Sequence, residues 1–325
     1  MNRAQLPRSA ATIPIREIGS FFAGGQVVRL HQQPSRPLQV ARNGPARTVD
    51  GNGDHITGQC YVQYVRREAP LSEAPLMFWH GGGMTGATWE STPDGRAGWQ
   101  MYFLRRGFDT CICDAMERGR AGWSPYPEVY AEAPLFRTLE EAWAMFRFGA
   151  VGGYSRDAAA SAPFPGQQFQ TNSFEVLGAQ LVPRWIGHTE ATLQAYFAAL
   201  ERVGPAWAIA HSQGANLALE AAGRRPELFR GLVVVEPAAA PAEIGRAAEI
   251  PHLFLWGDFI AEAPIWGDYR EVADAYRDKL LAASATADLL DLPAEGIDGN
   301  SHLPMMDRNS DVIAERIYDW LCRQL

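Results

Sequence analysis

The sequence Ala-His-Ser-Gln-Gly at positions 210–214 surrounds Ser212 with the residue types that a catalytic nucleophile needs. The apolar run 206–210 predicts a short buried strand before the serine, and the alanine-rich stretch 215–222 predicts a helix after it. A sharp corner between strand and helix strains the serine backbone and requires small residues two positions away on either side. An alanine and a glycine stand there, where the usual pattern has two glycines. We therefore predict that Ser212 attacks a carbonyl carbon, with a plain turn as the alternative.

A glycine run supplies candidate groups for holding the negative charge that such an attack creates. His-Gly-Gly-Gly at 80–83 follows an apolar stretch, 75–79, that predicts a strand. Backbone N–H groups of Gly82 and Gly83 can face a substrate carbonyl without obstruction, and the N–H of Gln213 completes an oxyanion hole. A flexible loop is the alternative. A phosphate-binding loop is disfavoured, because neither G-K-[ST] nor G-x-G-x-x-G follows.

His302 is the candidate general base among the seven histidines. It ends the sequence Gly-Asn-Ser-His at 299–302, between a predicted strand at 288–292 and a predicted last helix at 311–323. A histidine on this loop can reach over the sheet to Ser212. Because a lone loop histidine is more often a surface residue, the assignment depends on this position relative to the serine.

Two carboxylates compete for the role of the acid that orients the histidine. Glu236 follows the near-continuous β-branched run 231–235, which is typical of a strand buried on both faces, and Asp258 follows the next predicted strand, 253–257. Functional groups collect at the carboxyl ends of parallel strands, and both residues satisfy that rule. Glu236 could alternatively cap a helix or pair with an arginine. Asp258 could instead hydrogen-bond to the loop that carries His302.

Composition restricts the classes of function. The 325 residues, 47% of them hydrophobic, suit one large α/β domain with an insertion. A formal net charge of −8 without any Lys/Arg-rich block argues against a nucleic-acid partner. The four cysteines lack metal-ligand spacing, and we expect neither a metal nor a cofactor.

Membrane association and export leave no visible signal in the sequence. No apolar run reaches membrane-spanning length, and Met1 to Pro14 has no sustained apolar core of a signal peptide. We therefore expect a cytoplasmic protein without membrane contact. An exported form whose leader has been removed stays open.

Strand patterns alternate with helical patterns along most of the chain. The segments Ile18 to Ala23 and Gln26 to Leu30, joined by Gly24-Gly25, predict a β-hairpin, and Gly58 to Arg66 predicts a third strand. The later alternation predicts a mostly parallel sheet. Its strands are expected near Leu76, Phe108, Trp207, Gly231, His252 and Ala287.

The segment from about 117 to 187 interrupts this alternation and is rich in aromatic residues. A connection of this length in a compact domain is usually functional or disordered, and its aromatic content disfavours disorder. We predict a single domain over 1–325, in which 117–187 is an inserted cap over Ser212. Thr138 to Phe148 predicts a helix within it. Aromatic side chains more often pack than bind, so no single one is assigned to the substrate.

Considered together, the motifs resemble the α/β-hydrolase superfamily, and within it bacterial esterases of the Alcaligenes type. The likeness runs from about Ile18 to the end of the chain. It implies an α/β-hydrolase fold with a mostly parallel central sheet, and it implies Glu236 as the acid and a homodimer. Those esterases have two adjacent cysteines where Gly82 and Gly83 stand, so any property of that pair does not transfer. The matching segments are 80–81, 84–86, 88–90, 92–96, 118–120, 211–214, 235–237, 299–302 and 307–309.

The sequence thus predicts a serine hydrolase that cleaves a carboxylic ester through an acyl-enzyme on Ser212. The aromatic cap favours a small-molecule ester with a hydrophobic or aromatic acyl group. An acyltransferase would use the same intermediate while excluding water. A non-catalytic ligand-binding protein of this fold is disfavoured, because such proteins often lack part of the triad that this chain retains.

Overall fold

The structure is a computed structural model that describes residues 12–325, so most of the Met1 to Pro14 stretch lies outside the described residues. An eight-stranded sheet with the order β1-β4-β6-β5-β7-β8-β9-β10 forms its centre. The strands are β1 (Ile15–Leu30), β2 (Arg36–Leu38), β3 (Arg47–Val49), β4 (Gly53–Arg67), β5 (Leu76–Trp79), β6 (Thr110–Asp114), β7 (Ala206–His211), β8 (Phe229–Val235), β9 (His252–Trp256) and β10 (Ala287–Asp291).

Most neighbouring strands of the sheet are parallel. From β6 through β5, β7, β8 and β9 to β10 every pair is parallel, whereas β4 is antiparallel to both of its neighbours, β1 and β6. This arrangement confirms the predicted mostly parallel sheet. Because parallel strands end at the same edge, the residues that follow β5, β7, β8 and β9 are brought together.

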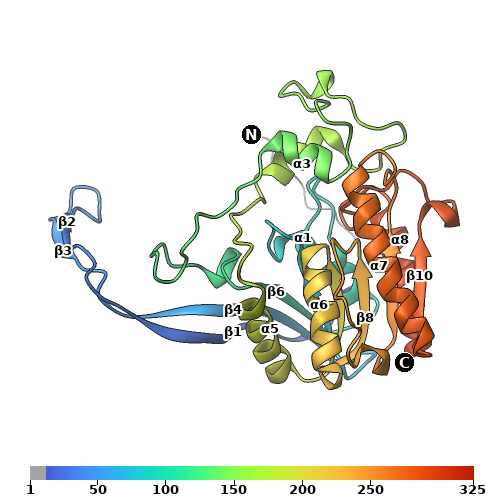
Figure 1. Ribbon diagram of the computed structural model, residues 1–325, viewed down its shortest axis with the longest axis horizontal. Helices are drawn as coiled ribbons and strands as arrows, with labels where there is room; N and C mark the ends of the chain where they lie inside the picture. The colour runs from blue at the N-terminus through green and yellow to red at the C-terminus, as the bar shows by residue number, and fades with distance from the viewer. Residues whose placement is uncertain (1–11) are drawn as a thin grey trace.

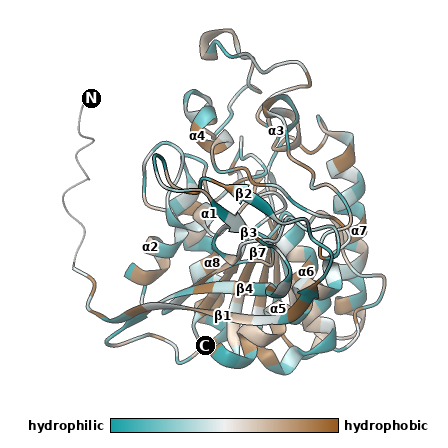
Figure 2. Ribbon diagram, turned by 90° about the vertical axis from the view of Figure 1, so that its left-hand side faces the viewer, coloured by the Kyte–Doolittle hydropathy of each residue, from teal (hydrophilic) through white to brown (hydrophobic). Residues whose placement is uncertain are grey.

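Helices cover both faces of the sheet, as Figure 2 shows. One face packs against α5, α6 and α7, and the other against α1, α2 and α8. The α-helices are α1 (Ala87–Glu90), α2 (Trp99–Arg105), α3 (Leu139–Met145), α4 (Phe174–Gly178), α5 (Thr189–Val203), α6 (Gln213–Arg224), α7 (Pro264–Ala282) and α8 (Ser310–Gln324).

Strand β7 illustrates how the sequence builds these layers. Its alanines at 206, 208 and 210 belong to the core on the α6 side, while Trp207 and Ile209 belong to the core on the α8 side. Alternate side chains of a strand point to opposite faces, and small ones allow a helix to pack closely. The alanine-rich α6 therefore lies tightly on β7, which fixes the residue that joins the two elements.

A hairpin near the N-terminus is present, but not where the sequence places it. β2 and β3 form an antiparallel pair at the far end of the ribbon made by β1 and β4 (Figure 1). The predicted hairpin of Ile18 to Ala23 with Gln26 to Leu30 is wrong, because β1 continues through Gly24-Gly25 and pairs with β4 on both sides. The glycine permits close packing instead: a Cβ added at Gly24 would lie 2.9 Å from the Cα of Ala195 in α5.

The segment 117–187 contains α3 and α4, which lie beyond one end of the sheet in Figure 1. The predicted helix at 138–148 is confirmed, although it ends earlier, at Met145. Thr138 caps it by accepting a hydrogen bond from the Glu141 backbone N–H at 3.1 Å. Among residues 12–325, no helix combines the length and apolar content needed to cross a membrane.

Candidate active site

Ser212 occupies a strained corner between β7 and α6. Its backbone has φ 52° and ψ −118°, a conformation that non-glycine residues rarely adopt. A Cβ added at Gly214 would approach the His80 carbonyl oxygen to 2.5 Å, so no larger residue fits there. The Ser212 N–H donates to the Val235 carbonyl at 2.9 Å, which ties the corner to β8. The predicted strand-to-helix corner is therefore present. The close packing around Gly214 explains why a small residue is required there.

His302 and Glu236 contact each other next to this corner. His302 Nδ1 lies 3.2 Å from Glu236 Oε2, and both side chains are buried. Because a carboxylate only accepts, Nδ1 carries the proton, and Nε2 is left as an unprotonated nitrogen. A histidine in this state can take a proton from a hydroxyl group.

The backbone places His302 beside the serine corner. His211, which precedes Ser212, donates from Nε2 to the His302 carbonyl oxygen at 2.8 Å. Within the described residues, Ser212 Oγ and His302 Nε2 are not joined by a hydrogen bond. Catalytic hydrogen bonds often form only when substrate binds, so this geometry is compatible with proton transfer in a substrate complex.

Arg147 is a member of this cluster that sequence reasoning missed. Its guanidinium is fully buried and binds Glu236 with both nitrogens, Nη1 to Oε2 at 2.8 Å and Nη2 to Oε1 at 2.6 Å. Arg147 Nε donates to the Asp258 carbonyl at 2.7 Å. Glu236 thus pairs with an arginine, as the alternative interpretation had it, and contacts His302 as well. The sequence signal that could have identified it is its position between Phe146 and Phe148. An arginine between two apolar residues indicates a buried cation, and a buried cation needs a carboxylate partner.

These contacts set the charges at the site. Burial alone would raise the pKa of Glu236, but the Arg147 charge and the hydrogen bonds from His302 and Arg147 outweigh it and lower this pKa to about 2. Burial lowers the pKa of His302 to about 4, and Glu236 offsets only part of that effect. At neutral pH the pair is therefore a carboxylate and a neutral imidazole.

Asp258, the alternative acid, contacts the loop and not the imidazole. Its Oδ2 accepts from the Gly299 N–H at 2.8 Å, and its own N–H donates to the Asn300 carbonyl at 2.8 Å. Asp307 supports the same loop by accepting from the N–H and the hydroxyl of Ser301, each at 2.8 Å. Burial raises the pKa of Asp307 to about 7. Two carboxylates thus hold the loop that presents His302.

The glycine loop after β5 lies against the serine corner. A Cβ added at Gly81 would lie 2.7 Å from His211 Nδ1 and 3.2 Å from Ser212 Cβ. Within the described residues, the N–H groups of Gly82 and Gly83 donate to no acceptor. Gln213 begins α6, so its N–H has no partner within the helix. The glycine loop and the start of α6 thus offer N–H groups without a partner in the described residues, which is what the predicted oxyanion hole needs.

Asp114 fixes the far end of this glycine loop. Its Oδ1 accepts from the Gly86 N–H at 2.6 Å, and its Oδ2 accepts from Arg120 Nε at 2.7 Å. At the near end, His80 Nε2 accepts from the Ala115 N–H at 3.1 Å. Burial lowers the pKa of His80 to about 4, so this ring stays neutral and keeps its acceptor. The loop is held at both ends by β6 and the residues after it.

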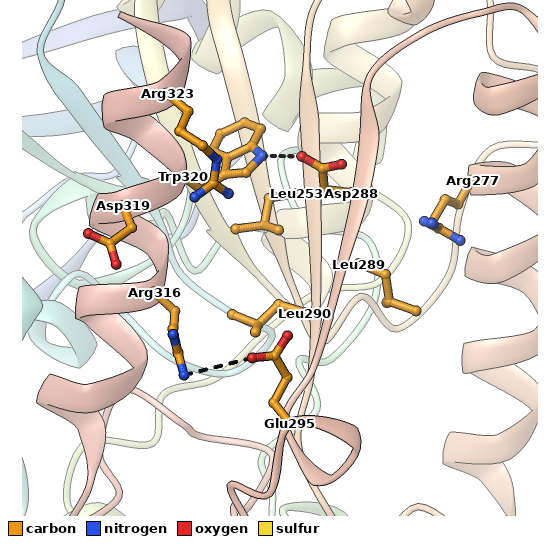
Figure 3. A pocket seen from close by; sticks show the side chains of 10 residues that line it. All are labelled: Leu253, Arg277, Asp288, Leu289, Leu290, Glu295, Arg316, Asp319, Trp320 and Arg323. Carbon is orange, nitrogen blue, oxygen red and sulfur yellow. Dashed lines mark hydrogen bonds and ion pairs between the residues drawn. The ribbon is translucent and has the colours of Figure 1, made fainter.

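The larger hollows of the molecule lie away from this cluster. One of about 530 Å³ lies between β10 and α8 (Figure 3), where Trp320 Nε1 donates to Asp288 at 2.8 Å and Arg316 lies 3.8 Å from Glu295. A cavity of only about 20 Å³ reaches Gln213 beside the corner. The candidate site is therefore identified by its cluster of reactive side chains and not by the volume of a cavity.

A mostly parallel sheet flanked by helices, with a serine at a strand-to-helix corner, defines an α/β-hydrolase. A solved structure of a bacterial esterase has a TM-score of 0.81 to this chain and is 31% identical, covering 98% of this chain and 99% of its own. A probable secreted lipase, phiG, from a fungal species is 26% identical, covering 85% of this chain and 88% of its own. No protein-family model matches the chain. The chain belongs to the α/β-hydrolase superfamily and, within it, to the family of that bacterial esterase.

Proposed function

We propose that the protein is a serine esterase in which Ser212 is the nucleophile, His302 the general base and Glu236 the acid that orients the base. The reaction class, hydrolysis of a carboxylic ester, follows from membership in the esterase family. The observation that supports the residue roles best is the 3.2 Å contact between His302 Nδ1 and Glu236 Oε2 beside the strained Ser212 corner.

The reaction has two steps. His302 Nε2 takes the Ser212 hydroxyl proton as Oγ attacks the ester carbonyl, and the oxyanion is held by the N–H groups of Gln213 and of Gly82 or Gly83. The carbon–oxygen bond to the alcohol then breaks, and His302 returns the proton to the departing oxygen. Water attacks the acyl-enzyme by the same route and frees Ser212.

Arg147 acts as a positioning residue in this scheme. Its bidentate pair with Glu236 keeps the carboxylate ionised and fixes the oxygen that accepts from His302. Because the cation also neutralises much of the carboxylate charge, it disfavours protonation of His302 in the free enzyme. The base is therefore ready in its neutral form.

We assign the segment 117–187 the role of a cap. Its residues Phe146 and Arg147 contact the proposed site: the Phe146 carbonyl accepts from the His302 N–H at 2.9 Å, and the Phe146 ring lies 5.8 Å from the imidazole. The Trp266 ring also contacts this imidazole, with ring centroids 3.9 Å apart. Aromatic surroundings of this kind favour a hydrophobic or aromatic acyl group in a small-molecule ester.

Turnover of a series of p-nitrophenyl esters, from short to long acyl chains, tests the proposal. We expect the wild type to hydrolyse part of the series and Ser212→Ala to hydrolyse none of it. Unchanged turnover by Ser212→Ala would remove Ser212 from the mechanism. Acyl transfer to an added alcohol in preference to water would identify an acyltransferase, and saturable binding without product would indicate a ligand-binding protein.

Cytoplasmic location and a homodimer remain proposals. The fungal relative is described as a probable secreted lipase, so that protein is placed outside the cell. Fractionation of the producing cells tests the location, and the molecular mass in solution tests the dimer.

A further inference from the structure

We propose that Arg184 binds a carboxylate of the substrate, so that the preferred ester carries a negative charge a few atoms from the bond that is cleaved. This inference rests on the proposed function, because it places the acyl group beside Ser212. It concerns a residue outside the triad and the oxyanion hole, and it names the class of ester.

The backbone around Arg184 is fixed against the glycine loop. The Val182 N–H donates to the Gly83 carbonyl at 2.8 Å. Two residues on, Arg184 pairs with Leu135 in both directions, with N···O distances of 2.9 and 2.8 Å. Arg184 is therefore held in place at the end of the segment 117–187.

The guanidinium of Arg184 lies over Gly82. A Cβ added at Gly82 would overlap Arg184 Nη1 and would lie 2.9 Å from the side-chain oxygen of Gln213. Gly82 and Gln213 are two of the residues whose N–H groups are proposed to hold the oxyanion. A substrate carbonyl in that hole therefore has the Arg184 cation as a close neighbour.

Arg184 has no counter-ion among residues 12–325. No carboxylate oxygen lies within 4.0 Å of its guanidinium, and its side chain donates no hydrogen bond, although the residue is partly buried. The nearby Glu117 is already used: it lies 3.1 Å from Arg118 and 2.7 Å from His188, and it accepts from the Trp185 N–H. A partly buried cation without a partner favours an anionic ligand.

Two further arginines lie near Arg184, and each already has a carboxylate partner: Arg118 lies 3.1 Å from Glu117, and Arg137 lies 2.8 Å from Glu141. Burial lowers the pKa of both Arg118 and Arg137, and the charge of Arg184 acts on both in the same direction. The three cations are close enough to repel one another, and Arg184 is the one of the three that has no carboxylate partner among residues 12–325. The planar guanidinium fork matches a carboxylate, and a monoester of a short dicarboxylic acid would place one there while its ester carbonyl enters the oxyanion hole.

Two p-nitrophenyl esters with five-carbon acyl groups test the inference: the glutarate monoester, which is anionic, and the neutral pentanoate. We expect the wild type to prefer the glutarate monoester in kcat/KM. Arg184→Gln should lower kcat/KM for the glutarate monoester by about tenfold or more, mainly through KM, and change the pentanoate value less than about threefold. Arg156→Gln, an exposed position in the same segment, removes the same charge and should change neither.

Binding without turnover gives a second readout. Free glutarate should raise the Tm of Ser212→Ala but not that of the Ser212→Ala, Arg184→Gln double variant. An equal loss on both esters would mean that Arg184 serves the oxyanion or the fold, and would overturn the inference. A wild type without preference for the charged ester, together with no Tm shift, would also overturn it. If the wild type cleaves neither ester, the proposed function fails, and the Tm shift alone decides whether Arg184 binds a carboxylate.

Discussion

At the scale of single residues, Glu236 is shared between a cation and an imidazole. Arg147 binds both of its oxygens, and His302 shares one of them. Replacement of Glu236 by Gln should lower kcat by orders of magnitude, because the imidazole loses its orientation and Arg147 loses its counter-ion. Asp258→Asn is the matched control and should keep most of the activity, since the Asp258 side chain accepts only from the backbone N–H groups of Phe259 and Gly299. Normal activity of Glu236→Gln beside an inactive Asp258→Asn would show that Asp258 is the acid.

The low pKa of His302 predicts the pH profile. His302 is active as a base only when it is deprotonated, and its pKa is about 4. The kcat/KM for a neutral ester should therefore rise as the pH passes about 4 and be level near neutrality. A stopped assay across pH 3 to 8, with stability checked at each pH, measures this. A midpoint near 6.5, the ordinary value for histidine, would contradict the assigned environment.

Arg147 should affect both stability and this profile. Arg147→Met leaves the buried Glu236 without its cation, which we expect to lower the free energy of unfolding by about 3–5 kcal/mol. The pKa of His302 should rise, because a nearby positive charge is removed. Urea unfolding and the pH profile of kcat/KM measure the two effects. Arg147→Lys keeps the charge and should lie between the wild type and Arg147→Met in both stability and midpoint. If Arg147→Met has unchanged stability and an unchanged midpoint, the Arg147–Glu236 pair has no such role.

At the scale of elements, the β7–α6 corner depends on Gly214. Gly214→Ala places a methyl group against the His80 carbonyl, so we expect a loss of about 1–3 kcal/mol in stability and a large loss of activity. Gly267→Ala in α7 is the control, because no atom lies within 4 Å of the added Cβ, and alanine favours the helix. Thermal unfolding and ester turnover of both variants measure this. Equal stability of the two variants would contradict the packing described for the corner.

The elements were more predictable from sequence than their contacts. Strands such as β7 and β8 are continuous apolar runs, and their ends marked Ser212 and Glu236 correctly as neighbours in the fold. Gly24-Gly25 led to the wrong hairpin, because a glycine pair is typical of a tight turn. In the structure Gly24 instead allows β1 to pack closely against α5. Arg147 and Arg184 were missed because each lies next to residues far away in the chain, Glu236 for Arg147 and Gly82 for Arg184.

At the scale of the whole molecule, the candidate site combines distant parts of the chain. The loop after β5, the segment 117–187, the corner after β7, the end of β8 and the loop before α8 all contribute to it. Ser212 is only 9% exposed, and the adjoining cavity is small. If the segment 117–187 is the cap that we propose, it should move when an ester enters; its helix α3 lies beyond one end of the sheet (Figure 1).

The central claim is that Ser212 is the nucleophile, and the site of covalent labelling tests it most directly. The protein should be treated with a fluorophosphonate, digested, and analysed by mass spectrometry at the level of peptides. One adduct on Ser212, absent from Ser212→Ala and much slower to form in His302→Ala, is the predicted result. An adduct on another residue, or no adduct in a protein that still hydrolyses esters, would contradict the account.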